Sequence, residues 1–253
     1  MIKISNISCV IIAKNAQETL IDVLNALKNF EEIILYSNNS TDKTNSIVLS
    51  YKNVKLIQGE FIGFGPTKNI AASYATKDWI FSLDADEVVS KDFIHNLSKT
   101  KLSKNCIYSI LRTNFYKKRQ IKHCWANDEI IRIYNKRTTA FTDKYVHEHI
   151  MQKDLKIEKI KGFINHYPYT SIESFIEKTN IYSTLFAKNN VGKKSSSPSK
   201  AFCNGLFSFI KTYFFKQGFL DGYAGLVIAF SHMTTNFYKY IKLYELNQEL
   251  KSK

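Results

Sequence analysis

The chain has 253 residues, of which 44% are hydrophobic and 23% are charged. This composition excludes an intrinsically disordered chain, and nine Gly with three Pro exclude a collagen-like or linker-type chain. Thirty-six Lys and Arg against 22 Asp and Glu give a formal net charge of +14. A balance this basic favours an anionic partner, such as a phosphate-bearing substrate, lipid headgroups or nucleic acid.

Cysteine usage and apolar segments bear on the compartment. The four cysteines (Cys9, Cys106, Cys124 and Cys203) stand far apart without a CxxC pair, which favours a reducing compartment. The N-terminal segment turns polar too soon for a signal peptide, and no run reaches the roughly 18 apolar residues of a spanning helix. We therefore expect a cytoplasmic protein.

The first 90 residues alternate between short apolar runs and segments with helical spacing. Buried strands are predicted at residues 7–13, 31–37, 54–58 and 78–87. Helices are predicted between them, at residues 17–29, 43–52 and 67–75. This order predicts a parallel, doubly wound α/β sheet.

A polar cluster follows each predicted strand. Ligands of such sheets bind at the carboxyl ends of the strands. These ends carry Lys14-Asn15, Ser37–Asp42, a glycine-rich loop at residues 59–66, and Asp84–Asp86. We therefore expect the four clusters to converge on one rim of the sheet.

The pattern changes beyond residue 90. Residues 106–116 and 128–135 predict strands of an antiparallel part, and residues 140–151 have an extended character. After Tyr169 the chain becomes helical and aromatic, and a polar segment at 188–200 precedes a final aromatic region at 201–247. Gly218–Gly225 predicts the turn between two helices, with Asp221 as a cap of the second.

The sharpest chemical signal is Asp84-Ala85-Asp86 at the end of the fourth strand. Side chains alternate along a strand, so both carboxylates project from one side. Two such carboxylates form a hard oxygen site for Mg²⁺ or Mn²⁺, which would neutralise a departing diphosphate. The alternative is an acidic turn in which Asp86 or Glu87 caps the next helix.

Three other clusters are less specific. Gly63 and Gly65 permit close backbone approach and Lys68 follows in the first helical turn, which suits a phosphate or a plain turn. His147 and His149 share one strand face and Glu148 takes the other, which suits a metal or a base, or a purely structural role. Asp128-Glu129 precedes a strand carrying Arg132, which suits a general base or an ion pair.

Together these segments resemble the inverting family 2 glycosyltransferases of the GT-A fold, and more narrowly the bacterial lipopolysaccharide-core β-glucosyltransferases. The resemblance spans most of the chain, in ISCVIIAKN, EEIILYSNNSTDKT, GFGPTKNIAASYATKDWIFSLDADE, DEIIRIYN, VHEHI and NHYPY…FLDGYAGLVIA. It implies an α/β, Rossmann-like mixed sheet with a helical, aromatic-rich C-terminal extension. The implied catalytic domain is residues 1–168, with its nucleotide-sugar half at 1–90 and its acceptor and metal half at 91–168, and the extension is 169–253.

The resemblance also implies roles for single residues. Ala13, Asn15, Ser40, Asp42, Lys68 and Asp84 would bind the donor. Asp86, Asp84 and His147 would hold the divalent cation, Mn²⁺ or Mg²⁺. Asp128 would be the base, with Glu129 and Glu148 as the alternatives. A UDP-hexose donor is favoured, but family members usually end the second strand with an Asp that pairs with uracil, and Ser37 stands there instead, which leaves the nucleobase open.

The implied reaction transfers a hexose from a nucleotide-diphosphate sugar to a hydroxyl of a lipopolysaccharide, lipooligosaccharide or related glycolipid. The basic and aromatic remainder suits an anionic membrane surface, on the inner face of the cytoplasmic membrane, or helix packing alone. The alternatives are a protein, peptide or capsule acceptor, or a non-catalytic nucleotide-binding relative. A nucleic-acid partner is disfavoured, because the basic residues are scattered and no recognised binding motif is present.

Overall fold

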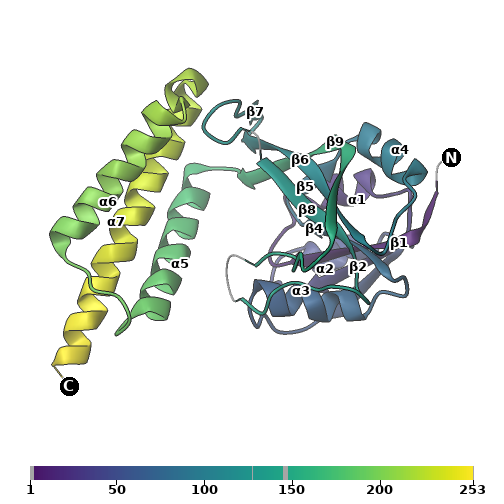
Figure 1. Ribbon diagram of the computed structural model, residues 1–253, viewed down its shortest axis with the longest axis horizontal. Coiled ribbons are helices and arrows are strands. Elements are labelled where there is room, and N and C mark those ends of the chain that lie inside the picture. Colours follow the sequence, from purple (N-terminus) through teal and green to yellow (C-terminus); the bar gives the residue numbers. More distant parts are fainter. Residues whose placement is uncertain (1–2, 127, 145–147, 253) are drawn as a thin grey trace. The chain divides into compact units, whose positions relative to one another are not determined.

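The computed structural model describes residues 3–126, 128–144 and 148–252, which form two compact units (Figure 1). The first unit comprises Met1–Thr113 and Asn127–His166, and the second comprises Asn114–Ala126 and Tyr167–Lys253. The expected boundary after residue 168 differs from this division in one respect, since Asn114–Ala126 groups with the C-terminal helices. Strands β6 and β9 both continue from the first unit into the second.

The described part of the chain forms one sheet of nine strands in the order β3-β2-β1-β4-β8-β6-β9-β5, with β7 paired to β6. The strands are β1 (Ile4–Ala13), β2 (Phe30–Ser37), β3 (Val54–Gln58), β4 (Trp79–Asp84), β5 (Glu87–Val89), β6 (Cys106–Tyr116), β7 (Arg119–Gln120), β8 (Asp128–Asn135) and β9 (Lys156–Tyr169). Strands β3, β2, β1 and β4 pair in parallel, as expected. The β4–β8, β6–β8 and β5–β9 pairs are antiparallel, so the sheet is mixed.

Helices cover both faces of the parallel part. Alternation along β1 sends Cys9 and Ile11 into one buried cluster and Val10 and Ile12 into another. The first cluster is closed by α1 (Leu20–Ala26), α2 (Thr44–Val48) and α4 (Lys91–Lys99), and the second by α3 (Phe64–Ser73). These two clusters form the core that fixes the carboxyl ends of the strands.

Several elements differ from the sequence-based expectation. Strand β9 was not anticipated, and the strand expected over residues 78–87 ends at Asp84, with Glu87 beginning a second strand, β5. Ser90 caps α4 by accepting the Phe93 N–H, so the alternative in which Asp86 or Glu87 caps that helix is wrong. The segment expected to be extended at 140–151 contains a single bridge, Phe141 to Ile150, among its described residues.

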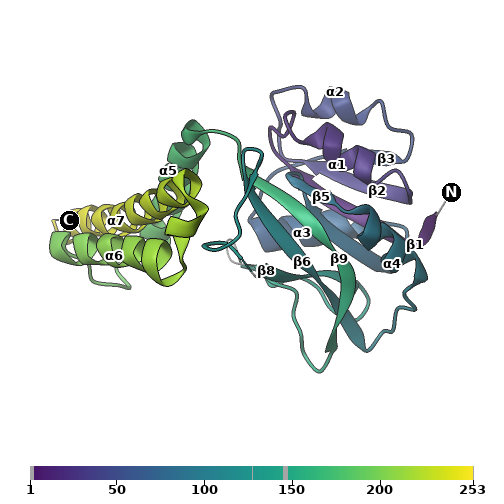
Figure 2. The same cartoon turned by 90° about the horizontal axis from the view of Figure 1, so that it is seen from above.

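The second unit is mainly helical. Its helices are α5 (Ile172–Asn190), α6 (Pro198–Ile210), a π-helical turn η1 (Lys211–Phe215), a 3₁₀ turn η2 (Gly218–Asp221) and α7 (Tyr223–Lys251). Helices α6 and α7 lie side by side in both views, joined by η1 and η2 (Figures 1 and 2). No described helix is both long enough and apolar enough to cross a membrane.

The turn between α6 and α7 is held by a close backbone approach and by Asp221. A Cβ on Gly225 would lie 1.8 Å from the Gly218 carbonyl oxygen, so only glycine fits there. The expectation that Asp221 caps α7 is wrong, because Gly222 is the N-cap. The buried Asp221 carboxylate instead accepts backbone N–H bonds from Lys122, His123 and Cys124.

Candidate active site

Two loops at the carboxyl ends of β1 and β2 are joined by hydrogen bonds. The N–H groups of Asn15, Ala16 and Gln17 donate to Ser40 Oγ, Thr44 Oγ1 and Asp42 Oδ2 at 3.1, 2.8 and 3.1 Å. In return, Asn15 Oδ1 accepts the Thr41 N–H at 2.8 Å. Asn15 adopts a left-handed backbone conformation with φ of 50°, which asparagine tolerates better than most residues.

The expected donor-binding residues in these loops therefore lie together. Ala13 is the last residue of β1 and pairs with Ser37 at the end of β2. The buried Ser37 hydroxyl donates to Ser40 Oγ at 3.0 Å. Burial would raise the pKa of Asp42, but hydrogen bonds from Thr44 and Gln17 outweigh burial and hold it below its usual value. Asp42 is thus an ionised link between the two loops.

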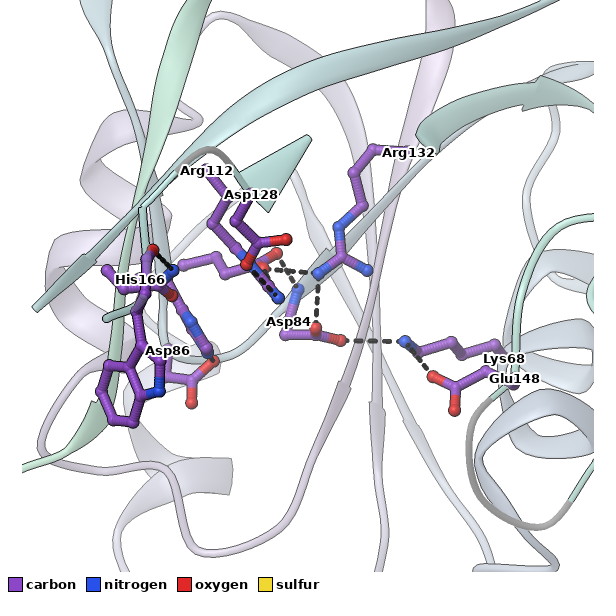
Figure 3. Close-up of polar contacts among 11 residues, drawn as sticks. Lys68, Asp84, Asp86, Arg112, Asp128, Arg132, Glu148 and His166 are labelled. Carbon is purple, nitrogen blue, oxygen red and sulfur yellow. Dashed lines mark hydrogen bonds and ion pairs between the residues drawn. The ribbon is translucent and has the colours of Figure 1, made fainter. Parts of the chain in front are cut away.

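Next to these loops, at the end of β4, seven side chains form a chain of alternating charges (Figure 3). In order, the chain is Glu148, Lys68, Asp84, Arg132, Glu87, Arg112 and Asp128. Lys68 Nζ lies 2.8 Å from Glu148 Oε1 and 3.0 Å from Asp84 Oδ1, and Arg132 Nη2 lies 2.6 Å from Asp84 Oδ2. Each cation joins two carboxylates, so we call this set the charge chain.

Elements far apart in sequence supply the members of the charge chain. Lys68 comes from α3, Asp84 and Glu87 come from β4 and β5, and Arg112 and Arg132 come from β6 and β8. Arg112 and Asp128 are directly opposed in the β6–β8 pairing, where Arg112 donates to Asp128 Oδ2 at 2.8 Å through Nε. The antiparallel strands therefore deliver two arginines and a carboxylate to the rim built by the parallel strands.

Burial makes the pairing within the charge chain essential. Glu87 is fully buried, and it also accepts the Asp84 N–H at 3.1 Å. Burial alone would raise the pKa of Asp84, but the charges of Arg132 and Lys68 outweigh it and hold that pKa well below its usual value. For Arg132 the signs are reversed. Burial alone would lower its pKa, but the negative charges of Asp84 and Glu87 outweigh burial and raise it. Asp84 and Arg132 are therefore both charged at neutral pH.

The three carboxylates expected as candidate bases occupy different places. Asp128 shares a face of β8 with Arg132 and its side chain is 30% exposed. Glu129 projects from the opposite face, where it accepts from Ser109 at 2.6 Å and Lys159 at 2.7 Å. Glu148 lies at the Lys68 end of the charge chain and is 15% exposed. The structure therefore brings Asp128 and Glu148 to the site, and Glu129 away from it.

Asp86 comes two residues after Asp84 in the sequence, and its carboxylate faces the imidazole of His166. His166 Nε2 lies 3.7 Å from Asp86 Oδ1, because β9 pairs with β5 and sets His166 opposite Glu87. Burial lowers the pKa of His166 to about 4, so its ring is neutral at pH 7. His147, the expected third metal ligand, lies outside the described residues.

The residues present fit a divalent cation that is completed by its substrate. No cluster of three His, Cys, Asp or Glu converges on a cation site within the described ranges. Both oxygens of Asp84 face cations, Lys68 and Arg132, rather than open space. Asp86 and the neutral His166, which face each other, offer one carboxylate and one imidazole, a donor pair that suits an ion such as Mg²⁺ or Mn²⁺ that takes its other ligands from phosphates and water.

The glycine-rich loop has a packing role. Helix α3 begins at Phe64 with Gly63 as its N-cap, so Lys68 lies in the second turn and not in the first. A Cβ on Gly65 would lie 1.9 Å from the Thr142 carbonyl oxygen, and the Gly65 N–H donates to the Lys144 carbonyl at 3.2 Å. The space that Gly65 leaves is therefore filled by the backbone of residues 142–144, which precede Glu148.

Sequence reasoning missed three members of this region. Arg112 and His166 were given no role, and Glu87 was considered only as a helix cap. His166 stood inside the NHYPY segment quoted for the resemblance, but without β9 nothing placed it beside Asp86. A polar residue that interrupts an apolar strand, as Arg112 does in CIYSILRTNFY, was the available signal for a buried ion pair.

Comparisons with known proteins identify the class. The family model described as Glycosyl transferase family 2 matches residues 8–160. An uncharacterized glycosyltransferase of Rickettsia typhi is 31% identical over 95% of this chain and 87% of its own length. The lipopolysaccharide core biosynthesis glycosyltransferase LpsC of Rhizobium meliloti is 24% identical over 88% and 89% of the two chains. The crystal structure of S. aureus TarS 1-349 covers 98% of this chain and 91% of its own, with 14% identity and a TM-score of 0.48.

The mixed sheet and the family match define a nucleotide-diphospho-sugar transferase fold, GT-A, with a helical C-terminal region. The chain belongs to glycosyl transferase family 2. It is therefore a glycosyltransferase, as the resemblance of its sequence implied.

Proposed function

We propose that this glycosyltransferase moves a hexose, with inversion, from a nucleotide-diphosphate sugar to a hydroxyl of a lipopolysaccharide-core or related glycolipid acceptor. The observation that carries the proposal is the charge chain at the end of β4, since it joins a buried lysine to a partly exposed carboxylate. Near one end of the chain the Lys68 ammonium would face the diphosphate, and at the other end Asp128 would act as a base for the hydroxyl.

The donor would bind along the loops after β1 and β2. Ala13, Asn15, Ser40 and Asp42 lie together in those loops, at the edge of the sheet where ligands of such folds bind. Lys68 and Asp84 would then face the ribose and diphosphate. Ser37 stands where the resemblance implies an aspartate, so this position offers no carboxylate to a uracil, and its hydroxyl donates to Ser40 instead.

Asp128 is proposed as the general base. It would take the proton of the acceptor hydroxyl while that oxygen bonds to the anomeric carbon and the bond from this carbon to the diphosphate oxygen breaks. Arg112 donates to Asp128 Oδ2 and so fixes the orientation of the carboxylate. The Asp128 carboxylate is 30% exposed, so an acceptor hydroxyl could reach it, and the planar guanidinium of Arg112 fixes its orientation.

Asp86 and His166 would hold the divalent cation. When bound, Mn²⁺ or Mg²⁺ would neutralise the negative charge on the departing nucleoside diphosphate. Lys68 would also neutralise charge on the departing diphosphate. Glu148 and Asp84 hold its buried ammonium in position.

The acceptor class has weaker support. LpsC, a lipopolysaccharide core biosynthesis glycosyltransferase by name, aligns with 88% of this chain. The charge of +14 also suits a phosphorylated glycolipid acceptor.

The test measures donor hydrolysis and binding across UDP-, dTDP-, GDP- and ADP-hexoses, with and without Mn²⁺. It compares wild type with Asp86→Ala and with Glu129→Gln, the latter as a control on the opposite face of β8. We expect wild type and Glu129→Gln to select one donor in a Mn²⁺-dependent manner, and Asp86→Ala to lose that dependence. A panel without selection or metal dependence would contradict the proposal.

Lipopolysaccharide-core oligosaccharides are then supplied as acceptors with the selected donor. Transfer to these, but not to peptide or capsule fragments, is the expected result. Metal-dependent donor hydrolysis with transfer only to peptides would support the glycosyltransferase activity but contradict the proposed glycolipid acceptor.

A further inference from the structure

The turn that joins α6 to α7 in the second unit exposes a group of large apolar side chains. Phe214, Phe215, Phe219 and Leu220 are all exposed, and Phe215 is the most exposed of them at 74%. The Tyr213 ring connects them, with its centroid 5.3 Å from that of Phe214 and 6.3 Å from that of Phe219. Exposed apolar groups that cluster in this way mark an interaction surface.

Basic side chains flank this group and acidic ones are scarce. Lys211 is the first residue of η1 and Lys216 directly follows η1, and both are exposed. From residue 198 to residue 244 the sequence contains one acidic residue, Asp221. Its carboxylate is buried and already accepts three backbone N–H groups, so it contributes no exposed negative charge.

A second basic segment lies against the same turn within this unit. Lys117, Lys118, Arg119 and Lys122 are exposed in the segment that contains β7. The Lys122 N–H donates to Asp221 Oδ1 at 2.9 Å, and a Cβ on Gly222 would lie 3.4 Å from Arg119 Nη2. Residues about one hundred positions apart in the sequence thus form one surface. We call it the basic aromatic turn, comprising residues 117–122 and 211–220.

We propose that the basic aromatic turn is a docking surface for an anionic lipid bilayer. Phenylalanine and leucine side chains insert at the boundary between headgroups and acyl chains, and lysine and arginine pair with anionic headgroups. The inference does not depend on the reaction proposed above.

Charge decides against self-association as the use of this surface. An isologous dimer would place each basic aromatic turn against its own copy and bring the lysines of both chains together, with Glu173 near Lys117 as one exposed carboxylate against six basic residues. An anionic bilayer supplies both the apolar layer and the negative charge that this surface lacks.

The experiment is co-sedimentation of the full chain with phosphatidylcholine vesicles, prepared with and without phosphatidylglycerol, in the absence of donor and acceptor. We expect binding that requires phosphatidylglycerol and weakens with added salt. Lys118→Gln/Lys216→Gln, with one lysine from each basic segment, should weaken binding by about fivefold per residue removed. Lys101→Gln/Lys104→Gln, an equal charge change in the first unit, should bind as wild type does.

A second pair of variants tests the apolar part. Phe215→Ser should reduce vesicle binding, whereas Leu49→Ser, at a residue 77% exposed in the first unit, should not. Both positions are exposed, so both variants should fold, which circular dichroism would verify.

Equal binding to neutral and anionic vesicles, no binding at all, or equal loss in both lysine pairs would each overturn the inference. A dimer in sedimentation velocity that is disrupted by Phe215→Ser would overturn it too, since the turn would then be a self-association surface. Donor hydrolysis is measured separately, so failure here is distinguishable from failure of the proposed transfer reaction.

Discussion

Arg132 and Glu87 form an ion pair in which both partners are buried, with Arg132 on β8 and Glu87 at the start of β5. The same guanidinium nitrogen reaches Asp84, and Glu87 also accepts the Asp84 N–H. The Arg132 side chain, from the antiparallel part of the sheet, therefore holds the turn that carries Asp84 and Asp86 in place. A buried pair of this kind is costly to break, because the remaining partner keeps an uncompensated charge.

Replacing Arg132 with methionine should destabilise the first unit by about 3–5 kcal/mol. In this variant, Arg112 would be the one cationic partner left to Glu87, and Lys68 the one left to Asp84, among the ion pairs of the charge chain. Urea unfolding followed by Trp79 fluorescence in a Trp125→Phe background measures this loss. The double variant Glu87→Gln/Arg132→Met should lose less than the sum of the two single variants, since it removes both charges together. Additive losses would indicate that the pair is not coupled.

Asp128→Asn should lower the transfer rate by about 10²–10⁴-fold and leave donor affinity unchanged, because the amide cannot accept the hydroxyl proton. Glu129→Gln is the matched control, since the two residues are adjacent on β8 but project from opposite faces. Steady-state kinetics with the selected donor and acceptor separates the rate from the affinity. Equal losses in both variants would remove the assignment of Asp128 as the base.

His232 should make the second unit less stable in mild acid. Burial, with Lys216 and Lys239 nearby, lowers its pKa to about 4, whereas an unfolded histidine titrates near 6.5. The unfolded chain therefore binds the proton first as the pH falls. The stability contributed by the neutral ring is complete above about pH 6.5 and declines by up to about 3 kcal/mol by about pH 4.

Urea unfolding at a series of pH values tests the predicted loss of stability in acid. It uses a Trp79→Phe background, in which Trp125 reports on the second unit. His232→Gln should flatten the pH dependence between those limits, while keeping a polar atom near Thr212 Oγ1, which lies 2.9 Å from His232 Nδ1. An unchanged slope in His232→Gln would assign the dependence to other groups.

Asp221 should control the reactivity of the Cys124 thiol. Burial and the Asp221 carboxylate raise the pKa of Cys124 to about 12, so the native thiol is protonated and inert. Thiol titration of the native chain should show a rapid reaction at Cys203, the exposed cysteine among the four. Asp221→Ala should release the backbone N–H groups of residues 122–124 and accelerate labelling at Cys124. Mass spectrometry locates the modified residue, and slow Cys124 labelling in Asp221→Ala would contradict this role.

The parallel half of the fold was predictable because each of its elements has its own local signal. Alternation of apolar runs with helical spacing located β1 to β4, and β3 matched at both ends. Strand β9 lacked such a signal, since Lys156–Tyr169 mixes lysines and apolar residues without a buried face along its first half. It forms because β6 and β5 offer partners on either side, which is tertiary information.

The positions of the candidate site residues in the fold were predictable to the same extent. The acidic residues at the end of β4 and the loops after β1 and β2 follow from the rule on strand ends. What could not be predicted was which charges face one another. The pairing of Asp84 with Lys68 and Arg132, and the approach of His166 to Asp86, depend on the register of antiparallel strands and on the placement of α3. A one-residue change in the register of β8 would exchange Asp128 for Glu129.

In the proposed donor site, the hydrogen bonds between the loops after β1 and β2 would limit any attempt to alter nucleotide preference. Three consecutive main-chain amides, of residues 15–17, depend on the side chains of Ser40, Asp42 and Thr44 for their acceptors. A mutant library that randomises residues 40–44 alone would remove those acceptors and yield mostly misfolded loops. The two loops have to be varied together, with an oxygen acceptor retained at each of these three positions. Donor preference at the proposed site would thus change through linked substitutions in both loops.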